Sequence, residues 1–277
     1  MASSAADKCA RFAGLHETGC FVMPNPWDAG SAIFLESLGF KALASTSAGM
    51  AWAMGRPDGG VTLDEVLTHL EMLVKAVELP INADFENGFA DAPEALAANV
   101  ARAVRTGIAG LSIEDYTGER DTPLYELDLA VERIAAARAA IDASGLGVVL
   151  TARAEGLIRG RPSLDEILRR LHAYGAAGAD CLYAPGLRED DEIRAVAQAL
   201  APKPINVLTF GAPAARLEAL GVRRISTGGG LAAAAWGEFV RAARDIAENG
   251  AFEAFARGVG GRVLNPVFAA RARPASG

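Results

Sequence analysis

The chain has 277 residues, of which 51% are hydrophobic and 22% are charged, and its formal net charge is −7 at pH 7. This balance is that of an ordinary globular protein, and the apolar fraction is too high for a mostly disordered chain. The net negative charge and the lack of a lysine- and arginine-rich run argue against a nucleic-acid partner. No stretch of about 18 apolar residues indicates a membrane span, and the N-terminal segment has no apolar signal region.

The three cysteines, Cys9, Cys20 and Cys181, are odd in number and widely spaced. They therefore form neither a disulfide framework nor a zinc-binding Cys-x-x-Cys pair. Free, buried thiols of this kind are typical of a reducing compartment. We expect a cytoplasmic protein that acts on a small molecule, with no nucleic-acid or membrane partner.

Short apolar runs rich in β-branched residues alternate along the chain with longer helical patterns. The starts of these runs lie roughly 30 residues apart, which is the length of one strand–helix unit. The predicted strands are Cys20–Met23, Ala42–Thr46, Pro80–Asp84, Gly110–Glu114, Gly147–Arg153, Cys181–Ala184, Ile205–Thr209 and Arg224–Thr227.

Helical patterns occupy the segments between these strands. Leucines and valines recur at spacings of three and four residues from Leu63 to Val74, which is the apolar stripe of an amphipathic helix. A similar stripe runs from Ile167 to Tyr174. Thr62 and Ser163, each followed by acidic residues, are typical N-caps of these two helices.

Eight strand–helix units in a chain of this length predict an α/β protein with a (β/α)8 TIM barrel. A doubly wound open sheet is the alternative, but the first strand–helix turn lacks a GxGxxG motif. No linker of biased composition divides the chain, so we expect a single domain over residues 1–277. A further helical pattern near the end predicts a C-terminal helical extension at about 250–277.

In such a barrel the active site lies at the carboxyl ends of the strands. The polar residues at the predicted ends are Ser45, Thr46, Ser47, Asp84, Glu86, Glu114, Asp115, Arg153, Glu155, Asn206, Thr209, Ser226 and Thr227. Carboxylates that share one mouth repel each other unless a cation joins them, and oxygen ligands favour Mg2+ or Mn2+. Arg153 offers two parallel donors to a substrate carboxylate.

This donor set suits the stabilisation of an enolate, because a divalent ion chelated by a 2-oxo acid holds the negative charge that develops when a neighbouring bond breaks. The spacing alone leaves a second interpretation open, in which the same side chains form only caps and salt bridges without a metal.

Six segments at these strand ends are similar to motifs of the isocitrate lyase/phosphoenolpyruvate mutase superfamily, and the resemblance runs from about Phe21 to Ala233. The segments are Asn25–Ala32, Ser45–Gly49 with Gly55–Asp58, Asn82–Gly88, Ser112–Asp115, Ala152–Glu155 and Ala177–Asp180. Their order and their positions at successive strand ends make the resemblance specific.

The resemblance implies a Mg2+-dependent barrel enzyme that acts on small 2-oxo or 2-hydroxy acids through an enolate. It implies that Asp58, Asp84 and Glu114 hold the ion, directly or through water, and that Arg153 grips the substrate. Backbone N–H groups around Ser47 and Ala48 would cradle the substrate carboxylate. Members of the family usually form homotetramers, often with exchanged C-terminal helices, which the segment at 250–277 could provide.

The sequence departs from the family pattern in the motif of the third strand. The family motif is Asp-x-Asp with the first aspartate as the direct ligand, and the comparison places Asn82 at that position. An amide oxygen binds Mg2+ without contributing charge, so a lower affinity is expected, with Glu86 as a compensating ligand.

The loop after the fourth strand also departs from the family. The isocitrate and methylisocitrate lyases carry a Cys that donates a proton and a nearby His there, whereas residues 116–123 contain neither. Tyr116 or Asp121 would have to replace the cysteine. The Lys and Asn with which phosphonomutases hold a migrating phosphoryl group are also missing.

We therefore predict a carbon–carbon lyase that uses Mg2+ or Mn2+ to cleave a small 2-oxo or 2-hydroxy (di)carboxylate, in the manner of an oxaloacetate decarboxylase or a methylisocitrate lyase. The predicted catalytic residues are Arg153, Glu114, Asp58 and Tyr116, the substrate-binding residues are Ser45, Thr46, Ser47, Ala48, Arg153, Asn206 and Thr209, and the metal ligands are Asp84, Asp58, Glu114, Glu86 and Asn82. Two alternatives stay open: a phosphoenolpyruvate mutase-type phosphonomutase, and a barrel that binds 2-oxo acids without turnover.

Overall fold

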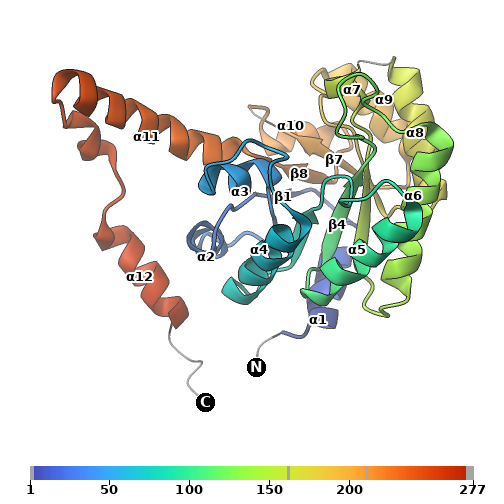
Figure 1. The fold of residues 1–277 in the computed structure, drawn as a ribbon, viewed down its shortest axis with the longest axis horizontal. Helices are drawn as coiled ribbons and strands as arrows, with labels where there is room; N and C mark the ends of the chain where they lie inside the picture. Colours follow the sequence, from blue (N-terminus) through green and yellow to red (C-terminus); the bar gives the residue numbers. More distant parts are fainter. Residues whose placement is uncertain (1–2, 161–162, 210, 273–277) are drawn as a thin grey trace.

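The computed structural model describes residues 3–160, 163–209 and 211–272, and in these residues eight parallel strands form a barrel at the centre of the molecule (Figure 1). The strands are β1 (Phe21–Met23), β2 (Leu43–Ala44), β3 (Ile81–Asp84), β4 (Gly110–Glu114), β5 (Val149–Arg153), β6 (Cys181–Tyr183), β7 (Ile205–Leu208) and β8 (Arg224–Ser226). Each strand pairs with the next in the chain from β2 to β8, and β8 pairs with β1. The predicted (β/α)8 TIM barrel is confirmed.

Asn25 joins the first and last strands at the barrel mouth. The Ala44 N–H donates to the Pro24 carbonyl over 3.1 Å, which brings β2 beside β1. The Asn25 side chain donates to the Ser45 carbonyl over 2.8 Å and accepts from the N–H of Thr227 over 2.9 Å. One amide side chain therefore connects the segments after β1, β2 and β8.

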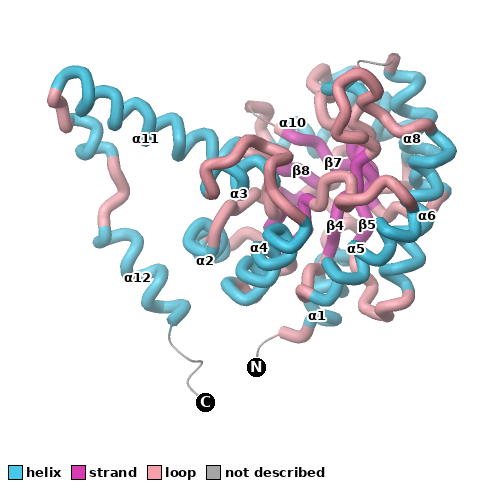
Figure 2. Tube along the Cα trace, in the orientation of Figure 1, coloured by secondary structure: helices cyan, strands magenta, loops and turns pink. Residues whose placement is uncertain are grey.

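Helices cover the outside of the barrel, as Figure 2 shows with the cyan helices around the magenta strands. They are α1 (Ala5–Gly14), α2 (Ala29–Ser37), α3 (Ser47–Ala53), α4 (Leu63–Ala76), α5 (Pro93–Arg105), α6 (Leu127–Asp142), α7 (Gly156–Arg159), α8 (Leu164–Ala176), α9 (Asp190–Leu200), α10 (Ala214–Ala219), α11 (Gly230–Asn249) and α12 (Gly261–Ala272), with a 3-10 turn, η1 (Glu253–Arg257). Because helices cover the outer face of the parallel sheet, the side chains on that face are apolar, whereas the barrel interior holds buried polar side chains such as Asn82, Asn206 and Arg224.

The two helices whose caps were predicted begin where expected. The Thr62 side chain accepts from the Glu65 N–H and Glu65 accepts from the Thr62 N–H, which is a complete capping box at the start of α4. The Ser163 side chain accepts from the Glu166 N–H at the start of α8. Val66, Leu67, Leu70 and Leu73 are among the α4 residues that are buried.

Helix α1 packs across the amino-terminal end of the barrel, and the sequence patterns did not predict it. Phe12 and Cys9 are buried, and the Lys8 ammonium donates to the Val77 carbonyl over 2.9 Å. With Phe12 seated under the strands, water is excluded from the end of the barrel opposite the predicted active site.

The C-terminal part of the chain leaves the barrel. Helix α11 projects away from it, the chain turns at η1, and α12 runs back toward α2 (Figure 1). The Arg271 side chain donates to the Ala76 carbonyl over 2.8 Å. The predicted helical extension at 250–277 is therefore helical at Gly261–Ala272, and residues 273–277 lie outside the described residues. Among the described helices, none has the length and apolar character needed to cross a membrane.

Candidate active site

Six of the predicted site residues line one cavity at the carboxyl ends of the strands. This mouth cavity has a volume of about 510 Å3, and its lining includes Ser47, Asp58, Glu86, Glu114, Tyr116 and Arg153. They come from the connections after β2, β3 and β4 and from the ends of β4 and β5, so only the folded barrel brings them together. Pocket volumes of this size are typical of small-molecule sites.

Arg153 is the central cation of this mouth. Its Nη1 lies 3.3 Å from Asp84 Oδ1 and 3.2 Å from Glu114 Oε2, and its Nε pairs with Glu155 Oε1. Its side chain is only 18% exposed. Three carboxylates from three strand ends therefore share one guanidinium, which keeps them from repelling each other.

A buried network fixes the orientation of Arg153 from behind. Glu155, which is fully buried, pairs with both Arg153 and Arg159, and its backbone N–H donates to Asp115 Oδ1 over 2.8 Å. Asp115 Oδ2 accepts from the Tyr174 hydroxyl over 2.6 Å and from Arg170 over 3.1 Å. The sequence pattern placed Tyr174 in an apolar stripe and did not predict this role. Tyr174 lies one helical turn after Arg170 on α8, and this spacing could have predicted that the two side chains lie close together.

The loop after β2 holds Asp84. The Ser45 hydroxyl accepts from the Asp84 N–H over 2.8 Å, and the Ser47 N–H donates to Asp84 Oδ2 over 3.0 Å. Thr46 caps α3 by accepting from Gly49 N–H over 3.3 Å, and Ala48 lies in the first turn of that helix. The Ser47 N–H that was predicted to bind a substrate carboxylate thus binds a protein carboxylate here.

Two carboxylates of the mouth, Glu86 and Glu114, have raised pKa values. Burial, with the charges of Asp84 and Asp58, raises the pKa of Glu86 to about 7. Burial also raises the pKa of Glu114 well above its ordinary value, although Arg153 lowers it. Glu86 Oε1 is buried and has no hydrogen-bond partner among the described residues. Raised pKa values in a cavity are typical of carboxylates at functional sites.

Two predicted residues lie deeper, inside the barrel. Asn82 is buried, and its Oδ1 lies 2.6 Å from the point that a Cβ on Gly110 would occupy, beside Phe12. Asn206 is buried too; it donates to Ser226 over 2.9 Å and accepts from Arg224 over 2.9 Å. Both line a small interior cavity of about 50 Å3 and neither lines the mouth cavity.

Thr209 lies to one side of the mouth. Its hydroxyl accepts from the N–H groups of Gly211 and Ala212, over 3.3 and 3.0 Å, and so forms the turn after β7. Asp58 reaches the mouth from the exposed loop at 55–60, which Arg56 anchors by pairing with Glu65 over 2.7 Å.

The donor set fits a divalent cation. Among the described residues, no three histidine, cysteine or carboxylate side chains converge closely enough to hold a bare metal ion. Asp58, Asp84, Glu86 and Glu114 nevertheless offer only oxygen atoms, they are close enough to affect one another's pKa, and Glu86 Oε1 lacks a partner. Mg2+ usually keeps several water ligands, so it can bind carboxylates that are too far apart to coordinate a metal ion directly.

Residues 12–247 match the model of the phosphoenolpyruvate phosphomutase family. The chain belongs to this family. It is 32% identical over 196 residues to the 2-methylisocitrate lyase of Escherichia coli K12, covering 67% of this chain and 64% of that protein. It is 30% identical over 224 residues to the oxaloacetate decarboxylase of Pseudomonas putida GB-1, covering 76% and 74%.

Solved structures extend the family likeness over nearly the whole chain. A protein of Burkholderia cenocepacia J2315, described as a candidate lyase/mutase, is 46% identical with a TM-score of 0.93, covering 98% of this chain and 97% of that one. A 2,3-dimethylmalate lyase, described as a member of the PEP mutase/isocitrate lyase superfamily, is 27% identical with a TM-score of 0.83, covering 96% and 95%. An oxaloacetate acetylhydrolase in complex with oxalate is 25% identical with a TM-score of 0.84, also covering 96% and 95%.

The family membership predicted from the strand-end motifs is confirmed. The named lyases among these relatives also confirm the prediction of an enzyme from a superfamily that cleaves carbon–carbon bonds.

Proposed function

We propose that the protein is a Mg2+- or Mn2+-dependent lyase that cleaves a carbon–carbon bond of a small 2-oxo or 2-hydroxy (di)carboxylate through an enolate. The observation that carries the proposal is the set of three carboxylates paired with Arg153 at the carboxyl ends of β3, β4 and β5. Relatives named oxaloacetate decarboxylase and 2-methylisocitrate lyase support both a decarboxylation and a retro-aldol cleavage.

Asp84 would hold the ion together with Asp58, Glu86 and Glu114. When bound, the divalent ion would supply the positive charge that stabilises the enolate oxygen. Glu86 and Glu114 must be ionised to bind it, and their raised pKa values mean that the protons leave as the cation arrives. Asn82 lines the same small interior cavity as Asp84, and its buried Oδ1 has no hydrogen-bond partner among the described residues, so this amide oxygen would be an uncharged ligand beside Asp84.

Arg153 would bind the substrate carboxylate through the part of its guanidinium that faces the cavity. Its Nε and Nη1 are paired with protein carboxylates, whereas Nη2 has no hydrogen-bond partner among the described residues. The Arg153 side chain is held rigidly by Glu155, so little rotamer entropy is lost when a substrate binds. The backbone N–H groups at the start of α3, near Ala48, would complete the carboxylate site.

The proton that quenches the enolate must come from water or from the loop after β4. Tyr116 lines the mouth cavity, and its ring lies 3.9 Å below the Arg159 guanidinium. Its hydroxyl donates to the Gly118 carbonyl over 3.1 Å, so the loop holds Tyr116 in a defined orientation. Decarboxylation needs only the enolate site and a water proton, which favours an oxaloacetate-like substrate over one that needs a strong acid.

The test is a turnover screen of 2-oxo and 2-hydroxy dicarboxylates, with Mg2+ and with EDTA. We expect one acid or more to be consumed only with the metal, and we expect Glu114→Gln to lower that rate by about a hundredfold or more. Glu132→Gln, on the exposed face of α6, is the matched control and should retain the rate. Turnover that persists in EDTA would contradict the proposal. A phosphonate formed from phosphoenolpyruvate, seen by 31P NMR, would favour a phosphonomutase.

A further inference from the structure

The loop between β3 and α5 carries Glu86 in a strained backbone conformation. Glu86 has a φ of 48° and Phe89 has a φ of 57°, and residues with a Cβ rarely adopt this left-handed region. Such conformations persist only where the surrounding structure fixes them, and they gather at functional sites. Glu86 lines the mouth cavity, and its backbone carbonyl accepts from the Glu114 N–H over 3.0 Å. The loop therefore also sets the spacing of two carboxylates of the mouth.

The side chain of Arg133, on α6, brackets the strained part of this loop. Its guanidinium donates to three backbone carbonyls, those of Asn87, Ala90 and Asp91. The first of these carbonyls follows Glu86 directly in the chain, and the second follows Phe89 directly. Each strained residue is therefore followed by a carbonyl that Arg133 holds.

The burial of Arg133 favours this role over simple packing. The residue is 1% exposed, and its hydrogen bonds among the described residues all go to backbone carbonyls rather than to a carboxylate. A buried guanidinium without a counter-charge has a large desolvation cost. An apolar side chain of similar length would avoid this cost, but it would leave three carbonyls of the loop without their donor.

Side chains of two neighbouring segments reinforce the same loop. The Tyr125 hydroxyl donates to Asp91 Oδ1 over 2.5 Å and accepts from Asn87 Nδ2 over 3.3 Å. The Asn99 side chain, on α5, donates to the Gly88 carbonyl over 2.9 Å. The loop is thus fixed from the side of α5 and α6, opposite to the side chain that it presents to the mouth.

We propose that Arg133 is a positioning residue of the metal site, which holds the loop at 86–91 so that the Glu86 carboxylate faces the mouth cavity. This inference rests on the proposed function, because it names a residue that serves the same site. Arg133 is not among the residues that line the mouth cavity, so it acts through the loop. Without its hydrogen bonds, the backbone at Glu86 would relax toward negative φ and the carboxylate would turn out of the cavity.

The test is Mn2+ binding by the full chain, followed by electron paramagnetic resonance of the free ion. Loss of a contact that orients a metal ligand weakens metal binding by about tenfold to a hundredfold, and we expect this of Arg133→Met. Arg138→Met is the matched control, because it removes an arginine of the same helix that pairs with Asp142 and Asp180 and does not line the mouth cavity. It should bind Mn2+ like the wild type. Wild-type affinity in Arg133→Met would overturn the inference.

A double variant separates positioning from a general loss of stability. In a Glu86→Gln background, Arg133→Met should change the Mn2+ affinity by less than about twofold, because the ligand that Arg133 positions is already lost. Equal weakening in both backgrounds would overturn the inference. If Arg133→Met does not fold, Tyr125→Phe, which removes only a hydroxyl, should weaken Mn2+ binding with the same dependence on Glu86. Wild-type affinity in Tyr125→Phe would then overturn the inference.

Hydrogen exchange of the metal-free protein separates this inference from the proposed function. Amides at 86–91 should exchange faster in Arg133→Met than in the wild type, whereas β7, across the barrel, should keep its rate. A wild type that binds no Mn2+ refutes the proposed function, and exchange alone then decides what Arg133 does. Faster exchange at 86–91 keeps the assignment of Arg133 to the loop, and unchanged exchange overturns it.

Discussion

Arg153 has a structural role as well as the proposed chemical one. Its ion pairs with Asp84, Glu114 and Glu155 neutralise a nearly buried group of carboxylates. Removal of one partner from a buried ion pair leaves an uncompensated charge, and this costs more free energy than the pair itself contributes. A loss of activity in an Arg153 variant therefore has two separable causes.

We expect Arg153→Ala to lower the free energy of unfolding by about 3 kcal/mol, because Glu155 and Glu114 lose their counter-charge. Arg153→Lys keeps the charge but lacks the planar fork, so it should remain nearly as stable and raise KM for the acid about tenfold or more. Urea denaturation and steady-state kinetics measure the two effects. A stable Arg153→Ala protein with normal kinetics would show that Arg153 neither balances the carboxylates nor binds the substrate.

Glu86 should make stability depend on pH. Its pKa is about 7 in the folded protein against an ordinary value of 4.5, so between these values the folded chain binds more protons than the unfolded chain. The free energy of unfolding should therefore fall as the pH rises from about 4.5 to 7, and the loss should be complete above pH 7.

Glu86→Gln should flatten this slope when urea denaturation is repeated across the same pH range without metal. The slope should not vanish, because Glu114 has a pKa shifted in the same direction. Glu132→Gln, exposed on α6, is the control that should keep the full slope. Equal slopes in the wild type and in Glu86→Gln would contradict the assigned acidity.

The segment from Asn82 to Glu86 shows how the register of a strand decides which side chains reach the mouth. Side chains at 82 and 84 both face into the barrel, but two residues along a strand are separated by about 7 Å. Asp84 ends β3 and lines the small interior cavity together with Asn82, whereas Glu86, two residues further along the chain, lines the mouth cavity. A spacing pattern does not show at which residue a strand ends, and this register decides which side chains reach the mouth.

At the scale of elements, the strands were predictable because parallel strands buried on both faces read as apolar runs. All eight predicted runs coincide with strands, and β4 has the predicted bounds Gly110–Glu114. The other strands are shorter by one to three residues at their ends, where turns begin. Helix α1 was missed because its amphipathic face has few large apolar residues, and its Phe12 packs only against the finished barrel.

The cluster of carboxylates around Arg153 was partly predictable because the strands themselves were predictable. The alternation of strands and helices shows roughly where each strand ends, so Asp84, Glu114 and Arg153 could be assigned to the same end of the barrel before any geometry was known. The supporting contacts of Glu155 with Asp115, and of Asp115 with Tyr174, join residues far apart in the chain. No local sequence pattern predicts such contacts.

The C-terminal arm, α11 to α12, carries apolar side chains in water. Trp236 and Phe239 pack edge to face on α11 with exposures of 39% and 61%, and Phe255 in η1 is 64% exposed. Large apolar side chains in a contiguous exposed patch mark an interaction surface. We propose that the arm docks on another copy of the chain, as expected for a homotetramer with exchanged C-terminal helices.

Phe239→Asp should weaken this assembly, because a charge at the interface is costly to desolvate. Size-exclusion chromatography with light scattering should show a shift from four copies to smaller species. Leu38→Asp, at the end of α2 with the same 61% exposure, is the matched control and should keep the wild-type mass. A wild-type chain that runs as a monomer would contradict the proposed role of the arm.

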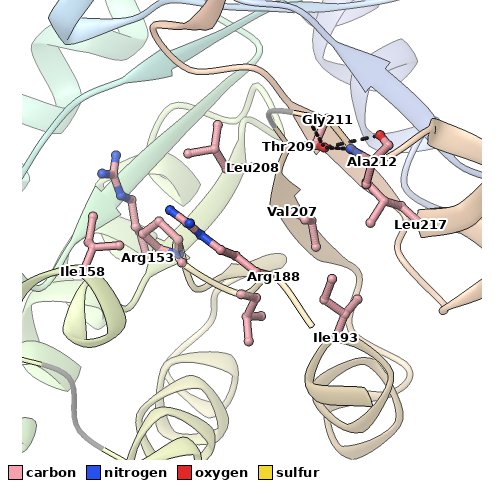
Figure 3. Close-up of a pocket in the computed structure, with 13 residues that line it drawn as sticks. Arg153, Ile158, Arg188, Ile193, Val207, Leu208, Thr209, Gly211, Ala212 and Leu217 are labelled. Atoms are coloured by element: carbon pink, nitrogen blue, oxygen red, sulfur yellow. Dashed lines mark hydrogen bonds between the residues drawn. The ribbon is translucent and has the colours of Figure 1, made fainter. Parts of the chain in front are cut away.

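At the scale of the whole molecule, the barrel places the positively charged side chain of Arg153 between three cavities. Arg153 lines the mouth cavity, the small interior cavity and a neighbouring cavity of about 590 Å3 between α7, α9 and α10 (Figure 3), so a change at this side chain affects each of them. Helix α1 seals the opposite end of the barrel. The proposed enolate chemistry and the stability of the strand ends therefore depend on the same group of charges.

The central claim is that the carboxylates of the mouth hold a divalent cation that binds a 2-oxo acid. Calorimetric titration with oxalate, a stable mimic of the pyruvate enolate, in the presence of Mg2+ and again with EDTA, tests it most directly. The account predicts binding with Mg2+ and none with EDTA, with Glu114→Gln weakened in the same assay. Oxalate that binds equally well in EDTA, or that does not bind in either condition, would contradict it.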